Sequence, residues 1–297
     1  MNPTETLCQQ TDRQKIEMIL DQKIIKYTGK RVFEKLVMTN DFKRMPKYFS
    51  ENEACFLFIT EGAFQFRTPT NLLSYSKNEA MLAKCGNYFI EEVPGKENKK
   101  EDTFSAIGAF FYPEMVKSFF ETDLSIKHFN NNFDVIKVNV EPLMKSFIDS
   151  IDFLLENQAI VDDNIIVNKL KELLLILSKS ENATSINDFV ASLFVPYEYD
   201  FNEIIQKNSY ANLSLEEYAT LCNCSLATFK RKFTERYKES PAKYFTAKKL
   251  EKATQLLQIK TMAIADIAYD CGFETIPNFN KAFKKHFGKS PSEYRLS

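Results

Sequence analysis

The spacing of hydrophobic residues changes near residue 141. From Lys30 to about Val138, short runs rich in Phe, Val, Tyr and Ile alternate with turn signals at Glu61-Gly62, Pro69-Thr70, Lys77-Asn78 and Cys85-Gly86. Such runs of four to eight residues are typical of β-strands, and two more fall at 103–112 and 133–140. Closely spaced short strands predict a small β-barrel or β-sandwich within residues 1–140.

After Pro142 the hydrophobic period lengthens to about 3.6 residues, which predicts two amphipathic helices paired as a hairpin over residues 141–185. Residues 178–185 have the composition of a linker or loop. One interpretation is that both helices only cover the strands. The other is that the apolar face of the second helix also contacts another subunit. The pattern alone does not separate core from interface. The first stripe is Leu143, Phe147, Ile151 and Leu154; the second begins at Ile166 and continues through the candidate dimerisation residues Leu170, Leu173, Leu174 and Leu177.

The last third of the chain contains one pattern twice, about 50 residues apart. The copies start at Ser214 and Ala263. Matched pairs are Ala219 with Ala268, Cys222 with Cys271, Asn223 with Gly272, Ser225 with Thr275, Phe229 with Phe279, Phe233 with Phe283, and Ser240-Pro241 with Ser290-Pro291.

Each copy predicts a helix, a tight turn and a second helix. Asn223 and Gly272 are the residue types that best tolerate a positive φ in the turn. Ser225 and Thr275 then cap the second helices, whose paired phenylalanines anchor one face in a core. Between the copies, residues 241–258 predict one long helix with Pro at its first position. At ~1.5 Å per residue it spans roughly 25 Å and sets the separation of the two motifs.

Charge singles out the second helix of each copy. Residues 198–297 contain 16 basic and 12 acidic residues, a net charge of +4, whereas the preceding residues carry a net charge of −5. Residues 225–238 and 276–289 each have a net charge of +4. One such run is more often a solvated face, but two runs in capped second helices favour contact with the phosphates of a DNA major groove.

Other chemistry is poorly supported by the sequence. There is no glycine-rich phosphate loop, nucleophile elbow or zinc-binding helix, and the two histidines, His128 and His286, lie far apart. We therefore expect no enzyme, although 40 acidic residues leave a carboxylate-based one open. The six scattered cysteines are interpreted as reduced thiols, and no metal or other cofactor is expected. The N-terminus is too polar for a signal peptide and no run spans a membrane, which predicts a cytoplasmic protein without membrane contact.

The repeated motif resembles the DNA-binding domain of the AraC/XylS family of bacterial transcription regulators. The resemblance covers residues 197–297 and is carried by the segment IADIAYDCGFETIPNFNKAFKKHFGKSPSEYR. In that family the second helix of each motif reads bases. The resemblance therefore implies base-reading roles for Ala227, Thr228, Lys230 and Arg231 in the first motif and for Ile276, Pro277, Asn278, Asn280 and Lys281 in the second.

The second motif departs from the family pattern at two of these positions. Neither Ile276 nor Pro277 offers a bidentate contact to a base, so we expect Lys230 and Arg231 to discriminate more strongly. The candidate phosphate contacts are Ser225, Arg236, Thr275, Lys284 and Lys285.

The front half resembles the cupin-like barrel and dimerisation helices of the subgroup typified by regulators of type III secretion. The resulting expectation is an α+β protein: a cupin-like barrel at 1–140, a helical hairpin at 141–185, and an all-α domain at 197–297. Expected partners are double-stranded DNA, a second copy of the chain, RNA polymerase by resemblance, and an unidentified small-molecule or protein effector. The favoured function is a sequence-specific transcriptional regulator, more often an activator. The alternative is an interaction protein whose barrel is bound by a regulatory protein, with DNA binding secondary.

Overall fold

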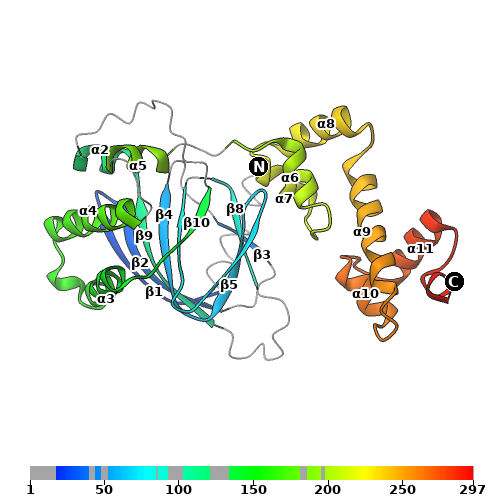
Figure 1. Cartoon of the computed structure of the whole chain (residues 1–297), viewed down its shortest axis with the longest axis horizontal. Coiled ribbons are helices and arrows are strands. Elements are labelled where there is room, and N and C mark those ends of the chain that lie inside the picture. The colour runs from blue at the N-terminus through cyan, green and yellow to red at the C-terminus, as the bar shows by residue number, and fades with distance from the viewer. Residues whose placement is uncertain are drawn as a thin grey trace, which may run out of the picture. The chain divides into compact units, whose positions relative to one another are not determined.

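The computed structural model describes residues 18–39, 44–47, 53–84, 86–92, 103–120, 134–180, 186–194 and 198–296. The chain divides into two compact units near Glu198 (Figure 1). The described strands and helices α2 to α5 form the first unit, and helices α6 to α12 form the second. The expectations made for Cys8, Cys85, His128 and residues 181–185 lie outside the described residues. No helix within the described ranges combines the length and apolar character needed to cross a membrane.

The described strands of the first unit form two antiparallel sheets. One sheet has the order β1-β2-β9-β4-β7-β10 and the other has the order β3-β8-β5-β6. The strands are β1 (Ile19–Tyr27), β2 (Lys30–Thr39), β3 (Arg44–Lys47), β4 (Ala54–Glu61), β5 (Ala63–Arg67), β6 (Leu72–Ser76), β7 (Ala80–Ala83), β8 (Tyr88–Glu91), β9 (Thr103–Phe111) and β10 (Val135–Val138).

Two of the predicted turns have backbone conformations that explain their sequences. Gly62, between β4 and β5, has φ 76°, and Asn78, between β6 and β7, has φ 68°. Both lie in the left-handed region that Gly and Asn tolerate best. A Cβ at residue 62 would also lie 2.5 Å from the carbonyl oxygen of Thr103. The strand breaks predicted at these turns are confirmed.

The expected cupin-like barrel is not closed. Among the described strands no ladder joins the two sheets, and the edge strands β1, β10, β3 and β6 each pair with one neighbour. A closed barrel needs every strand to pair on both sides, so the arrangement is a sandwich. Phe64 of β5 packs on Phe104 of β9 across the interior, with ring centroids 5.5 Å apart. The fold class is therefore corrected to an α+β chain with an open two-sheet sandwich.

Helix α3 (Pro142–Glu156) packs against β1 and β2. Phe147, Ile151 and Leu154 are buried, as the hydrophobic stripe predicted. Leu143 is 63% exposed, so its assignment to the stripe is wrong. Met144, one position along the first turn, takes the buried place instead.

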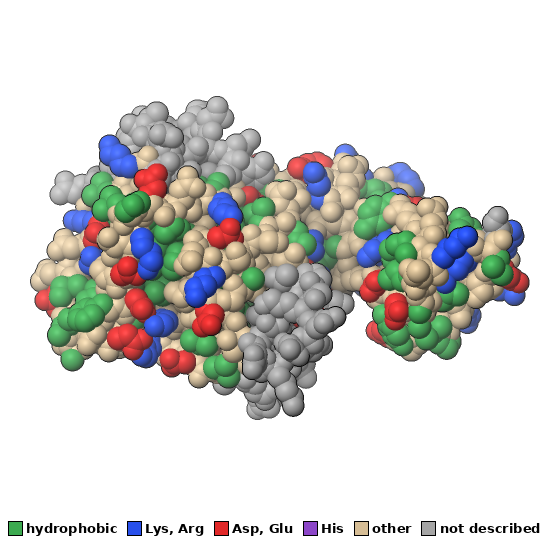
Figure 2. Space-filling model, turned by 60° about the horizontal axis from the view of Figure 1, so that its bottom comes forward, with side chains coloured by type: hydrophobic (Ala, Val, Ile, Leu, Met, Phe, Trp, Pro, Cys, Tyr) green, Lys and Arg blue, Asp and Glu red, His purple; other side chains and the backbone are tan. Residues whose placement is uncertain are grey.

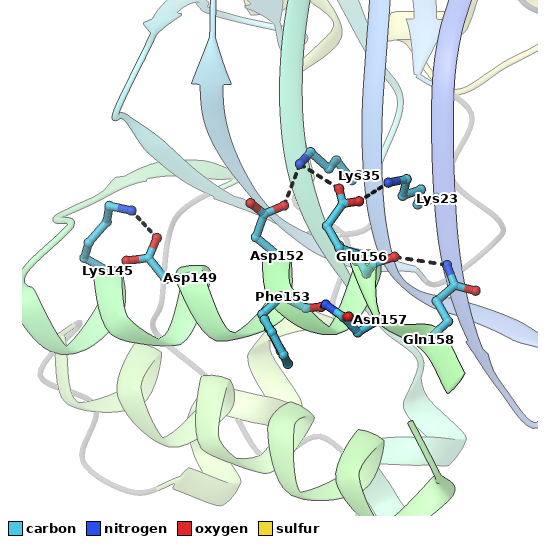
Figure 3. A network of polar contacts seen from close by, with 10 residues as sticks. Lys23, Lys35, Lys145, Asp149, Asp152, Phe153, Glu156, Asn157 and Gln158 are labelled. Carbon is cyan, nitrogen blue, oxygen red and sulfur yellow. Dashed lines mark hydrogen bonds and ion pairs between the residues drawn. The ribbon is translucent and has the colours of Figure 1, made fainter. Parts of the chain in front are cut away.

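Ion pairs also join α3 to the sheet (Figure 3). Lys35 Nζ on β2 donates to Asp152 Oδ1 at 2.7 Å and to Glu156 Oε1 at 3.1 Å. Lys23 on β1 pairs with the second oxygen of Glu156. The helix is thus held over the first two strands by apolar packing and by charge.

The four leucines predicted to form a dimer interface lie inside the first unit. Helix α4 (Asp163–Ser180) follows the short 3-10 helix Gln158–Ile160 and runs beside α3 (Figure 1). Leu170, Leu173, Leu174 and Leu177 are at most 1% exposed and share the core of the sheets. The expected interface is corrected accordingly, because side chains that already cover their own core have no surface left for a partner. Helices α2 (Pro113–Phe120) and α5 (Ile186–Leu193) complete the unit.

The second unit contains two similar groups of helices joined by α9. Phe245, near the start of α9, stacks on Tyr218 with ring centroids 4.1 Å apart. Leu250, Ala253 and Leu257, further along, share a core with α10 and α11. The single long helix predicted over 241–258 is confirmed. The helices are α6 (Phe201–Lys207), α7 (Leu215–Leu221), α8 (Leu226–Tyr237), α9 (Pro241–Leu257), α10 (Ile264–Asp270), α11 (Ile276–Phe287) and α12 (Pro291–Leu296).

Candidate nucleic-acid interface

Helices α7 and α8 form the first helix-turn-helix motif. A capping box starts α7: Ser214 accepts from the Glu217 amide, and the Glu217 carboxylate accepts from the Ser214 amide. Asn223 in the turn has φ 48°, and Ser225 Oγ accepts the Thr228 amide at 3.2 Å to cap α8. The left-handed turn residue and the serine cap are as predicted.

Helices α10 and α11 repeat this construction. Gly272 has φ 75° in the turn, and Thr275 Oγ1 accepts the Asn278 amide at 3.3 Å. Pro277 lies in the first turn of α11, where its missing N–H would have no helical partner. The proline therefore leaves the start of the second candidate reading helix intact.

One face of each second helix is buried by aromatic residues. Phe229 and Phe233 of α8 are fully buried, with ring centroids 5.8 Å apart, and α6 adds Phe201 at 5.8 Å from Phe229. Phe279 and Phe283 of α11 are likewise fully buried at 5.6 Å. Because these pairs fix which side of each helix faces the core, the opposite side faces solvent.

The solvent side of both helices carries the basic residues. Of the predicted base-reading residues, Thr228 and Ile276 are half-buried; those that are exposed are Ala227, Lys230, Arg231, Pro277, Asn278, Asn280 and Lys281. The structure thus places the predicted residues of each motif on one accessible helix. By contrast, acidic and basic side chains are intermixed over the first unit on the face shown in Figure 2.

Some of these side chains already have partners within their own motif. Arg231 pairs with Glu235, one turn later on α8, at 3.2 Å, and both side chains are more than 60% exposed. Thr228 Oγ1 accepts a hydrogen bond from Ser225 Oγ at 3.0 Å. An exposed pair of this kind is weak, so a base or phosphate can replace Glu235 at small cost.

The predicted phosphate contacts have different surroundings. Lys284 and Lys285 in the last turn of α11 are exposed. Arg236 is also exposed, and its Nε donates to Asn202 Oδ1 of α6 at 2.8 Å. Ser225 and Thr275 use their hydroxyls as helix caps. The contact from α6 was missed because the sequence pattern of the repeat begins only at α7.

The cysteines of the two turns are not poised for chemistry. Burial raises the pKa of Cys222 to about 12, and Cys224 nearby adds to the increase. Burial also raises the pKa of Cys271 to about 11. Both thiols are therefore protonated near neutral pH, which suits structural residues better than nucleophiles.

Two family models match the chain. A model of a helix-turn-helix domain matches residues 218–297, and a model of the ExsA N-terminal regulatory domain matches residues 54–189. The first covers the first motif from Tyr218 within α7 and the whole of the second motif, and the second covers most of the described sheets together with α3 and α4. Both units of the chain thus have a counterpart in known regulators.

Parts of the chain are also similar to individual known proteins. The thermoregulatory protein LcrF of Yersinia pestis is 28% identical over 161 residues, 54% of this chain and 58% of LcrF. The HTH-type transcriptional regulator ExsA of Pseudomonas aeruginosa is 26% identical over 127 residues, 43% of this chain and 46% of ExsA. The aligned region thus spans about half the length of these relatives. Among solved structures, ToxT from Vibrio cholerae is 17% identical to this chain. The match covers 89% of this chain and 97% of the ToxT chain, with a TM-score of 0.34.

Proposed function

Because the chain belongs to the AraC/XylS family of helix-turn-helix regulators, in the subgroup of type III secretion regulators, we propose that it activates transcription by binding a specific DNA sequence. In this proposal α8 and α11 enter two successive major grooves on one face of the duplex. Grooves on one face are ~34 Å apart, which a connector such as α9 can bridge together with the motifs at its ends.

The observation that carries the proposal is the shared construction of α8 and α11. Each helix is capped at its first turn, buried on one side by two phenylalanines and exposed on the other, and each carries a net charge of +3. A capped helix N-terminus with flanking cations is what the major groove and its phosphates accept. This supports both sequence reading and phosphate contact by the same two helices.

The two reading helices are proposed to contribute unequally. Lys230 and Arg231 offer long donors to guanine, with Ala227 and Thr228 beside them. In α11, Asn278, Asn280 and Lys281 offer polar contacts, whereas Ile276 and Pro277 offer only apolar contact, for example with a thymine methyl group. Arg236, Lys284 and Lys285 are proposed to contact phosphates.

Footprinting tests this proposal. Genomic fragments retained by the full-length protein are cloned, and hydroxyl-radical cleavage of the bound duplex is mapped. We expect two protected regions about 10 base pairs apart on one face. A single protected region, or uniform protection along the fragment, would contradict reading by two helices.

The first unit is proposed to dimerise through the outer side of the α3–α4 hairpin. There Leu143 is 63% and Leu175 47% exposed, and both border a groove with Ile176 and Lys179. Two exposed leucines beside a groove are the kind of apolar surface that a second copy can cover. The candidate interface therefore consists of exposed residues of α3 and α4 and no longer of the buried leucines of α4.

The effector site is proposed to be the cavity between the two sheets. Its lining is mainly apolar, including Met38, Leu57 and Phe104, and it also contains the ion-paired Arg31 and Glu34. A small molecule bound there would contact β2, whose outer side holds α3 through Lys35. RNA polymerase is the proposed target of activation, on the family resemblance.

A further inference from the structure

The turn between α10 and α11 in the second motif contacts Asn212, which lies just before the first motif in the chain. Gly272 follows α10 in this turn, and a Cβ built on it would lie 2.2 Å from Asn212 Oδ1 and 2.5 Å from Asn212 Cγ. Asn212 belongs to the loop between α6 and α7. The backbone of the second motif therefore approaches this loop so closely that an added methyl group would displace the asparagine.

Hydrogen bonds from two directions hold the same turn. Asn212 Nδ2 donates to the Asp270 carbonyl at 3.1 Å, and Lys252 Nζ on α9 donates to the same oxygen at 2.9 Å. Lys249 Nζ donates to the Gly272 carbonyl at 3.0 Å. These carbonyls lie at the C-terminal end of α10, where the helix dipole favours cations. We refer to Asn212, Lys249 and Lys252 together as the clasp.

The clasp accounts for a difference between the two copies of the repeat. The first copy has Asn223 at φ 48°, with an exposed side chain. The second copy has Gly272 at the matching position, where Asn212 occupies the space that a side chain would need. Glycine is thus required there for the approach of Asn212, whereas asparagine also adopts a positive φ at the matching position of the first copy.

Asn212 is itself held by the first motif. Leu213, next in the chain, is buried, and the Tyr218 hydroxyl of α7 donates to the Asn208 carbonyl at 2.6 Å at the start of the loop. Tyr210 in the same loop donates to Glu251 Oε2 of α9 at 3.1 Å. The loop is therefore fixed to the first motif and to α9 before it reaches Gly272.

We infer that the clasp fixes the position of α11 relative to α8 and so determines the spacing between the two DNA elements that the protein accepts. The inference rests on the proposed function, since it concerns how two reading helices act together. The clasped turn immediately precedes α11, so a displacement of the turn moves the whole reading helix. Asn212, Lys249 and Lys252 act here as positioning residues, and none of them needs to touch DNA.

The test compares affinity for duplexes that differ only in spacing. The full-length protein selects its preferred two-part duplex, and one base pair is then inserted between the parts, which turns the second part by about 35° around the helix axis. We expect the unaltered protein to lose about tenfold in affinity, the effect of one poorly matched contact or more. The variant Asn212→Ala/Lys249→Met/Lys252→Met is expected to lose less than about threefold relative to its own affinity for the original spacing.

A control separates positioning from loss of positive charge. Lys243→Met also removes a cation from α9, but Lys243 pairs with Glu239 at 3.5 Å near the start of the helix. This variant should keep the tenfold discrimination. If the clasp variant discriminates between the spacings as strongly as the unaltered protein, the inference is wrong. If the unaltered protein selects no sequence at all, the proposed function fails instead.

A second measurement needs no DNA. Gly272→Ala should lower the Tm of the full-length protein, because alanine is strained at φ 75° and its methyl group meets Asn212. In the Asn212→Ala background the same substitution should lower Tm by clearly less, since only the backbone strain remains. Equal losses in the two backgrounds would show that Asn212 does not press on this turn, and would overturn the inference.

Discussion

Arg231 shows how one residue of α8 combines general attraction for DNA with selectivity. Its guanidinium is exposed and paired only weakly with Glu235. A guanidinium presents two parallel donors that match the O6 and N7 acceptors of guanine, whereas an ammonium offers a single point charge. The contribution of this residue to affinity and to specificity can therefore be separated by substitution.

We expect Arg231→Ala to weaken specific binding by about 1 to 3 kcal/mol and to relax the preference at one base pair. Arg231→Lys keeps the charge and should preserve the salt dependence while losing most of that preference. Fluorescence anisotropy against the selected duplex and its single-base variants measures both quantities. Unchanged affinity and unchanged preference in Arg231→Ala would remove Arg231 from the reading surface.

Glu91 carries a buried charge that stabilises the first unit. Burial alone would raise the pKa of its carboxyl, but hydrogen bonds from Arg67 and Arg44 outweigh burial and hold the pKa below its usual range. Arg44 Nε donates to Glu91 Oε1 at 2.6 Å, and Arg67 donates to both carboxylate oxygens. Because the folded-state pKa is lowered, this stabilisation is present near neutral pH and disappears as the pH falls through that pKa.

Glu91→Gln should therefore reduce the free energy of unfolding by about 3 kcal/mol at neutral pH, as for the loss of one partner from a buried ion pair. The difference from the unaltered protein should shrink in acid. Asp149→Asn, which breaks the exposed Lys145–Asp149 pair, should cost less than about 0.5 kcal/mol at any pH. Urea unfolding over a pH series measures all three proteins. A deficit in Glu91→Gln that does not change with pH would contradict the assigned role of the charge.

At the level of elements, the hydrophobic period and the turn residues were sufficient to predict helices, caps and turns, whose contacts are local in sequence. The repeat predicted α8 and α11, the caps Ser225 and Thr275, and the left-handed turn residues Asn223 and Gly272, and the segment between the copies predicted α9. All of these depend on neighbours within a few residues. The strand pattern left a barrel and a sandwich open, because whether edge strands pair depends on contacts distant in sequence, and the closed barrel implied by the family resemblance is not confirmed. The contact of Asn212 with Gly272 is equally distant, and only the asymmetry between Asn223 and Gly272 hinted at it.

The cap of α8 can be tested by itself. Ser225→Ala removes the acceptor for the Thr228 amide and should destabilise the second unit by about 1 kcal/mol. Thr234→Ala, at an exposed position within the same helix, should be neutral or slightly stabilising because alanine favours helix. Thermal unfolding followed by circular dichroism distinguishes them. Equal Tm values for the two variants would mean that the serine cap contributes nothing.

At the level of the whole molecule, the sequence predicted three parts at 1–140, 141–185 and 197–297, whereas the structure has two compact units that divide near Glu198, with α3 and α4 in the first. The sequence did not identify which face of the α3–α4 hairpin is accessible, because an apolar stripe has the same pattern whether it covers a sheet or a partner. Burial of Leu170 and Leu174 and exposure of Leu143 and Leu175 decide between the two sides. The dimer proposal therefore concerns the side that the periodicity did not indicate.

We expect Leu175→Asp to shift the full-length protein toward monomer and to leave its folding intact, since Leu175 is 47% exposed. Leu174→Asp, one residue earlier and fully buried, should instead unfold the first unit. Sedimentation velocity and circular dichroism separate the two effects. A Leu175→Asp protein with an unchanged dimer population would exclude this face as the interface.

Selection of duplexes from a random DNA pool by the full-length protein, sequenced after a few rounds at physiological salt, tests most directly whether α8 and α11 read DNA together. The prediction is a motif of two parts about 10 base pairs apart, with the part read by α11 less sharply defined because of Ile276 and Pro277. Enrichment of no sequence, or of one uninterrupted part only, would contradict it.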